Sequence, residues 1–127
     1  MGITANFGGS TGNADYGSLG TYKYVQGDTS PQMMLTLTDK ETGFPIDLTN
    51  AQVQLHLRPV GGSVFLTRAL HIALLTAVNG EALVHWEPGD LDVDPGTYEA
   101  EVEILYSATL RETLFDVITL QIRADFA

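Results

Sequence analysis

Apolar and polar residues alternate along much of the chain, and this alternation predicts short β-strands whose side chains point to opposite faces. Residues 52–58 place Val53, Leu55 and Leu57 on one face and polar residues on the other. Residues 97–106 show the same pattern over a longer run, with every even position apolar or aromatic. Strands of this kind bury one face against a core, so the pattern favours an all-β protein.

Turn-forming residues divide the rest of the chain into further short segments. Additional strands are predicted at 21–25, 32–38, 64–67, 72–77, 81–86 and 110–124. The Asn79-Gly80 pair is typical of a type I′ hairpin and predicts that 72–77 pairs with 81–86. The alternation slips near 115–117, which predicts a bulge or bend in the last strand. Seven or eight short strands without a helix predict a β-sandwich or small barrel, with Trp86 in its core.

The first twenty residues differ in composition from the rest of the chain. Six of them are glycine and one is charged. The segment has too little apolar surface to offset the entropy that it would lose on ordering. It is therefore expected to be either a disordered tail or an extended arm that orders on a partner, with Phe7, Tyr16 and Leu19 as contacts. On this basis the chain divides into a glycine-rich arm, residues 1–20, and a sandwich domain, residues 21–127.

Acidic residues far outnumber basic ones, with 16 Asp and Glu against 6 Lys and Arg and a formal net charge of -10. A surface of this charge repels nucleic-acid phosphates and anionic lipid, so neither nucleic acid nor a membrane is an expected partner. No apolar run approaches the roughly 20 residues that a membrane-spanning helix requires. The chain has no cysteine, which excludes disulfides and thiolate metal sites.

Two acidic patterns carry candidate chemistry. Residues 90–94 alternate aspartate with apolar residues, but Pro95 occupies the position where a calcium loop needs glycine, so a solvated acidic turn is expected. Glu99, Glu101 and Glu103 share the outer face of their predicted strand, with neighbours roughly 7 Å apart. That spacing is compatible with a glycosidase carboxylate pair. An outer face instead favours a docking surface for a basic partner or an ordinary solvated face, so we predict no catalytic residue, no cofactor and no metal site.

Five segments, taken in order, carry a resemblance to a known family. They are residues 26–31, 45–53, 57–59, 79–84 and 96–102, each of which combines a turn with part of a strand. In this order the segments resemble the N-terminal domain of phage baseplate upper proteins. The resemblance implies an immunoglobulin-like antiparallel β-sandwich that works as a connector in a virion, and it implies no catalytic residue. The glycine-rich arm has no counterpart in that domain.

The expected function is that of a bacteriophage virion structural protein, which acts in assembly, connection or decoration through protein–protein contacts. Its partners would be neighbouring capsid, neck, tail or baseplate subunits, and it would form a homo-oligomer or occur in many copies. It would assemble in the host cytoplasm and reside in the virion. Two alternatives stay open: an adhesin-like module that binds carbohydrate or calcium, for which Trp86 would have to be exposed, and a hydrolase based on the row of glutamates.

Overall fold

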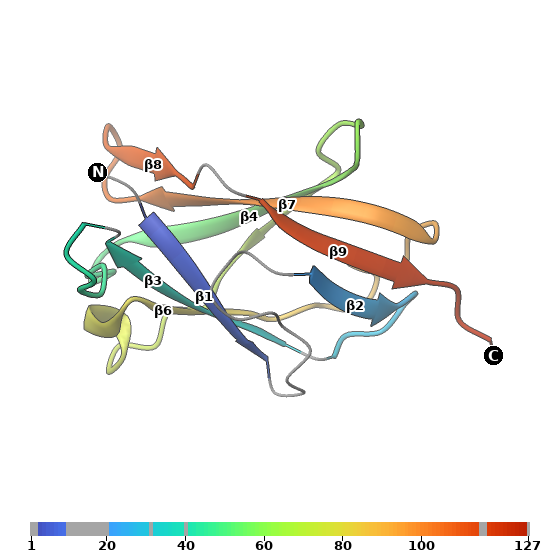
Figure 1. Cartoon of the computed structure of the whole chain (residues 1–127), viewed down its shortest axis with the longest axis horizontal. Coiled ribbons are helices and arrows are strands. Elements are labelled where there is room, and N and C mark those ends of the chain that lie inside the picture. Colours follow the sequence, from blue (N-terminus) through green and yellow to red (C-terminus); the bar gives the residue numbers. More distant parts are fainter. Residues whose placement is uncertain (1–2, 10–20, 31, 40, 115–116, 127) are drawn as a thin grey trace.

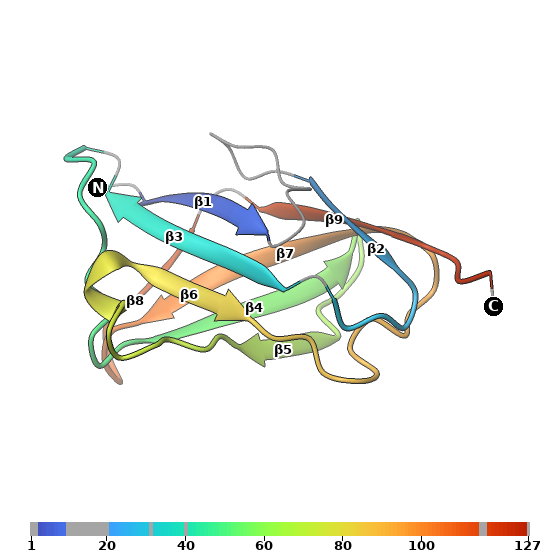
Figure 2. The same ribbon diagram turned by 90° about the horizontal axis from the view of Figure 1, so that it is seen from below.

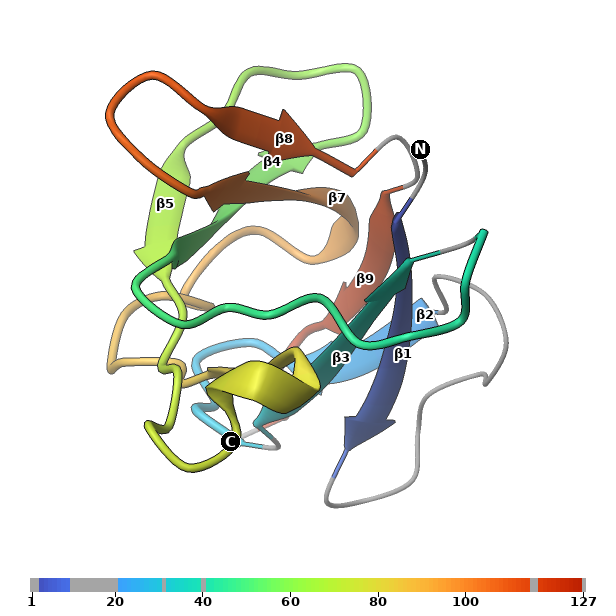
Figure 3. The ribbon, with the colours of Figure 1, turned by 90° about the vertical axis from the view of Figure 1, so that its left-hand side faces the viewer.

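The computed structural model describes residues 3–9, 21–30, 32–39, 41–114 and 117–126. Within these residues the chain forms nine β-strands and one short 3-10 helix, and the strands form two sheets. The sheets face each other as two layers, which Figure 3 shows from one end of the molecule. The predicted all-β sandwich is therefore confirmed.

The smaller sheet has three strands in the order β1-β3-β6, and both pairs are antiparallel. Its strands are β1 (Ile3–Gly9), β3 (Met33–Asp39) and β6 (Glu81–Val84). The central strand, β3, buries Met33, Leu35 and Leu37 completely, as its alternating pattern predicts.

The larger sheet has the order β2-β9-β7-β4-β5, and β8 also pairs with β7 (Figure 1). Its strands are β2 (Thr21–Val25), β4 (Gln52–Pro59), β5 (Leu66–Ala69), β7 (Gly96–Leu105), β8 (Arg111–Thr113) and β9 (Ile118–Arg123). Every pair is antiparallel except β2 with β9, which run parallel.

The core lies between the two sheets. Val53, Leu55 and Leu57 on β4 are buried, and so are the apolar even-numbered residues of β7 from 98 to 104. Trp86 is 5% exposed, and its indole Nε1–H donates a hydrogen bond of 3.0 Å to the Tyr24 hydroxyl. The predicted place of Trp86 in the core is therefore confirmed.

The predicted hairpin around Asn79 and Gly80 is wrong. Ala77–Asn79 forms a 3-10 helix, η1, and β6 pairs with β3 instead of with residues 72–77. A type I′ turn needs positive φ at both central residues, but only Gly80 has it, at 72°. The Leu37 N–H donates a 2.8 Å hydrogen bond to the Gly80 carbonyl, which ties this turn to β3. Residues 72–77 therefore form a loop rather than a strand.

The single long strand predicted at 110–124 is two strands, β8 and β9, which both pair with β7. The register of β9 against β7 differs by two residues from that of β8. The bulge or bend predicted near 115–117 stays a prediction, because residues 115 and 116 lie outside the described part.

The start of the chain supplies an edge strand to each sheet. Ile3–Gly9 pairs with β3 of the same chain, and Thr21–Val25 pairs with β9 (Figure 2). The sequence alone placed residues 3–9 in an arm awaiting a partner. Backbone hydrogen bonds to the edge of β3 stabilise this glycine-containing strand, and such bonds do not require apolar side chains. The division of the chain at Gly20 stays a prediction, because residues 10–20 lie outside the described part.

Candidate functional site

The predicted row of glutamates lies on the outer face of β7 and is largely neutralised by neighbouring cations. Glu99 accepts hydrogen bonds from Arg58, 3.1 Å from Nη2 and 3.3 Å from Nε. Glu103 lies 3.3 Å from His56 Nε2 and 3.6 Å from Arg111 Nη1. Glu101 is exposed and makes no ion pair with any described residue.

These pairs change what the row can do chemically. Two of its three carboxylates are held in cross-strand contacts, which orient the glutamates and reduce the free negative charge. The adjoining pocket has a volume of about 100 Å³ and is lined by His56, Arg58, Glu99 and Glu101, together with two valines. Small-molecule sites usually have roughly 300–1,000 Å³, so this pocket is too small to enclose a sugar ring. A docking role for Glu99, Glu101 and Glu103 stays a prediction.

The acidic turn at 90–94 contains a partly buried ion pair between Asp90 and Arg68. The Asp90 side chain is 6% exposed, and its Oδ2 accepts a 3.0 Å hydrogen bond from Arg68 Nε. Arg68 Nη2 also contacts Asp90 Oδ1, and the Glu87 N–H donates to Oδ2 at 2.8 Å. The hydrogen bond with Asp90 raises the pKa of Arg68. Asp90 therefore fastens the turn to β5 and is not free to bind a ligand.

The structure bears on the calcium and carbohydrate alternatives in the same region. Among the described residues, no three His, Asp or Glu side chains converge as a metal site would require. Trp86 is buried and offers no exposed indole face beside the acidic turn. The described residues therefore provide neither the metal ligands that the calcium alternative requires nor the exposed tryptophan that the carbohydrate alternative requires.

A different surface stands out at one end of the sandwich, where three loops meet. The loop between β3 and β4, the loop before β6 and the β7–β8 hairpin all lie at the left-hand end of Figures 1 and 2. These loops carry five apolar side chains that are more than half exposed, and we call this set the apolar end: Phe44 (71%), Leu74 (87%), Leu75 (89%), Val78 (54%) and Leu110 (60%). Monomeric proteins rarely expose such side chains together without a binding role.

Backbone contacts hold the apolar end in place. The Leu48 N–H donates a 2.9 Å hydrogen bond to the Ala77 carbonyl, which joins the β3–β4 loop to η1. Phe44 and Leu110 line a common open pocket of about 470 Å³, which joins that loop to the β7–β8 hairpin. The β3–β4 loop is therefore connected both to η1 and to the β7–β8 hairpin.

The rim of this pocket is acidic. Asp39, Asp47 and Glu112 line it together with the apolar residues. Asp47 accepts hydrogen bonds from the Thr49 hydroxyl at 2.6 Å and from the Thr49 N–H at 2.9 Å, and both lower the pKa of Asp47. The carboxylate is therefore held in its charged form. The surface combines an apolar centre with negative charge, which suits a partner that brings apolar and basic side chains.

Sequence reasoning missed the apolar end because it assigned residues 72–77 to one strand of a hairpin. In the structure Leu74 and Leu75 instead lie in a loop, 87% and 89% exposed. A usable signal was present: Phe44 lies between Gly43 and Pro45, in a segment whose composition predicts a turn.

The residues predicted as arm contacts are only partly placed by the structure. Phe7 lies on β1 opposite Leu35 of β3. Tyr16 and Leu19 lie outside the described residues. A partner-binding role for these three residues stays a prediction.

Comparison with known proteins gives little further guidance. No family model matches the chain, and no curated protein matches it. A solved structure of a family 123 glycoside hydrolase from Clostridium perfringens, studied for glycolipid glycan hydrolysis, is similar with a TM-score of 0.37 and 12% identity. The similarity covers 98% of this chain and 28% of that one, and at this TM-score it establishes neither a shared fold nor a shared activity. None of the helices in the described part is both long and apolar enough to cross a membrane.

Proposed function

We propose that this protein is a bacteriophage virion structural protein, an immunoglobulin-like sandwich that connects or decorates subunits through protein–protein contacts and has no enzymatic activity. The resemblance of its ordered turn and strand segments to baseplate upper proteins supports the virion setting. The chain would fold in the host cytoplasm and be present in many copies in the particle. Its partners would be neighbouring capsid, neck, tail or baseplate subunits.

The apolar end is the observation that carries this proposal. Five large apolar side chains on a rigid sandwich are unfavourable in water, and burial of one leucine against a partner contributes about 1.5–3 kcal/mol. The acidic rim adds selectivity, because it favours a partner with basic residues and disfavours an acidic one. Such a surface is suited to permanent assembly rather than to turnover of a substrate.

The test is incorporation into particles produced from the genome that encodes this chain. Purified particles should contain the wild-type protein in many copies, as measured by quantitative mass spectrometry. The double variant Leu74→Ser with Leu75→Ser should fold but be depleted at least tenfold from particles, because each change removes apolar contact worth about 1.4 kcal/mol or more.

The matched control changes two exposed valines outside the apolar end. Val60→Ser with Val64→Ser alters side chains that are 58% and 54% exposed in the β4–β5 loop, and it should leave incorporation unchanged. Absence of the wild-type protein from purified particles would refute the virion role. Equal loss of both double variants would refute the assignment of the contact to the apolar end.

A further inference from the structure

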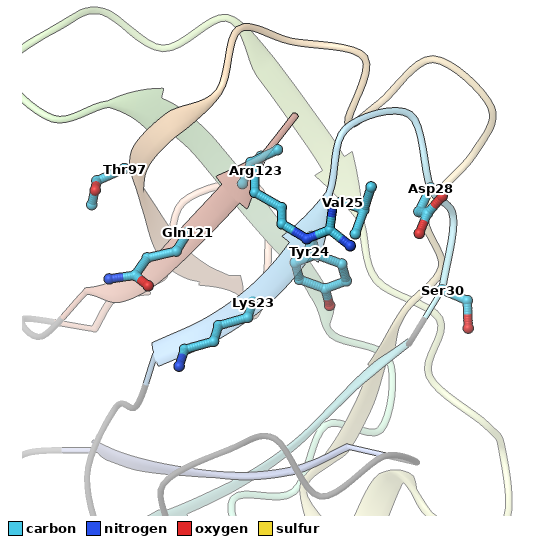
Figure 4. Close-up of a pocket in the computed structure, with 9 residues that line it drawn as sticks. Lys23, Tyr24, Val25, Asp28, Ser30, Thr97, Gln121 and Arg123 are labelled. Carbon is cyan, nitrogen blue, oxygen red and sulfur yellow. The ribbon is translucent and has the colours of Figure 1, made fainter. Parts of the chain in front are cut away.

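An open pocket of about 540 Å³ lies on the outer face of the larger sheet, beside its β2 edge (Figure 4). Lys23 comes from β2, Gln121 and Arg123 come from β9, and Thr97 comes from β7. Lys23 is in register with Gln121, and Val25 is in register with Arg123, so the two cationic residues occupy diagonal positions on adjacent parallel strands. Figure 1 places this site toward the end of the sandwich opposite the apolar end.

The two cations in this pocket differ from the other described cations. Arg58, Arg68 and Arg111 each make an ion pair with a carboxylate. Within the described part of the chain, Lys23 and Arg123 make none. In a protein with a net charge of -10, these two cations of one pocket thus lack an ion pair with any described residue.

The local environment keeps the charge of Arg123 available. The Arg123 guanidinium lies 4.7 Å from the centroid of the Phe126 ring, and its Nη1 donates a 2.9 Å hydrogen bond to the Ala124 carbonyl. These contacts orient the guanidinium without neutralising it. Asp28 also lines the pocket but forms no ion pair with the cations there. An incoming anion would therefore meet two cationic residues that come from diagonal positions on adjacent strands.

We infer that this pocket binds the carboxylates of an acidic segment from a partner protein. The guanidinium of Arg123 can hold a carboxylate with two hydrogen bonds, and Lys23 supplies a second positive charge. Gln121 and Thr97 provide an amide and a hydroxyl that can bond to a peptide backbone. The inference stands on this pocket alone and does not depend on the role of the apolar end.

The composition of the pocket favours a protein ligand over an acidic glycan or phosphate. Tyr24 is the aromatic residue among the described lining residues, but it is 3% exposed and cannot present a ring face to a sugar. Lys23 and Arg123 occupy diagonal positions on adjacent strands, an arrangement that suits carboxylates spaced along a peptide better than a single compact phosphate. Glucuronate and inorganic phosphate therefore serve as competing ligands in the test.

In the experiment, an acidic peptide with the sequence of residues 89–96 is added stepwise to the full-length protein. Binding is followed by the backbone amide resonances of the protein in NMR spectra. We expect the resonances of Lys23, Gln121 and Arg123 to shift on binding in low salt. The same peptide with every aspartate replaced by asparagine should bind at least about tenfold more weakly, as loss of a charge-assisted hydrogen bond implies. Binding of the acidic peptide should also weaken in 0.5 M salt, because salt screens exposed charges.

Variants assign the binding to the pocket. Lys23→Gln and Arg123→Gln should each weaken binding of the acidic peptide about tenfold. Arg111→Gln makes the same change in net charge at a residue paired with Glu103, and it should leave the affinity within about twofold. Thermal unfolding of each variant establishes that it is folded.

Three results would overturn the inference. They are absence of peptide binding at millimolar concentration, equal weakening by Arg111→Gln, and tighter binding of glucuronate or phosphate than of the acidic peptide. All three are independent of particle incorporation, so failure here is distinguishable from failure of the virion proposal.

Discussion

The hydrogen bond between Trp86 and Tyr24 gives a prediction that can be worked through in numbers. The Tyr24 hydroxyl is the acceptor for the buried indole N–H at 3.0 Å, and the two rings meet edge to face with centroids 5.7 Å apart. Tyr24→Phe removes the oxygen and keeps the ring. At pH 8 the variant should be less stable by about 1–3 kcal/mol, because the indole donor is left buried without this acceptor.

The same pair has a defined pH dependence. Burial raises the pKa of Tyr24 from 10.0 to about 12, and the hydrogen bond from Trp86 acts in the opposite direction with a smaller effect. A group whose folded pKa is raised contributes stability that is complete below its unfolded pKa and is lost as pH rises through the folded pKa. For Tyr24 the loss amounts to about 1.4 kcal/mol by pH 11 and about 2 kcal/mol by pH 12.

The difference in stability between wild type and Tyr24→Phe should therefore shrink as pH rises from 8 to 11. Burial also raises the pKa values of Tyr98 and Tyr106, but both proteins retain these residues, so their contributions cancel in the comparison. Urea unfolding followed by the fluorescence of Trp86, the sole tryptophan, measures the difference at each pH. A difference that stays constant or grows between pH 8 and 11 would refute the reasoning.

Two further substitutions test the structure, each by chemical denaturation. Asp90→Asn should cost about 1–3 kcal/mol because it weakens the charged hydrogen bonds to Arg68, which keeps only its exposed partner Glu87 at 3.3 Å, and adding Arg68→Met should restore part of the loss. An unchanged midpoint in Asp90→Asn would contradict this. Gly80→Ala should cost more than about 2 kcal/mol, because φ is 72° and a Cβ would lie 2.3 Å from the Leu37 carbonyl oxygen. Gly43→Ala is the matched control, because Gly43 has a similar φ of 74° and an added Cβ would meet no atom within 4 Å. If both variants lose the same stability, the close contact at Gly80 has no effect.

The strands that could be predicted from the sequence are those with one face buried along their whole length. The alternation in 52–58 corresponds to β4, Gln52–Pro59, and that in 97–106 corresponds to β7, Gly96–Leu105. A strand of this kind cannot shift by one residue without moving its apolar side chains into water, so the pattern defines it strongly. Residues 72–77 lack this constraint, and the hairpin strand predicted for them from the Asn79-Gly80 pair is wrong.

The ion pairs could not be predicted, because they depend on which strands are neighbours and in what register. Arg58 and Glu99 are 41 residues apart in sequence and face each other because β4 and β7 pair antiparallel. Arg111 reaches Glu103 through the pairing of β7 with β8. From sequence alone the glutamates form a row of free acids. For the same reason the sequence could not show that Lys23 and Arg123 make no ion pair with any described residue.

Taken together, the distribution of charge gives the molecule two ends of different chemistry. Ion pairs lie in the middle of the larger sheet, two cations without an ion pair to any described residue lie beside β2 and β9, and the apolar end carries an acidic rim. If both proposed contacts form, each copy would offer a cation-lined pocket toward one end and an acidic, apolar surface at the other (Figure 1). Contacts between unlike surfaces are heterologous, and they build rings or filaments rather than two-fold dimers. That consequence fits a protein repeated around or along a particle better than one that acts as an isolated pair.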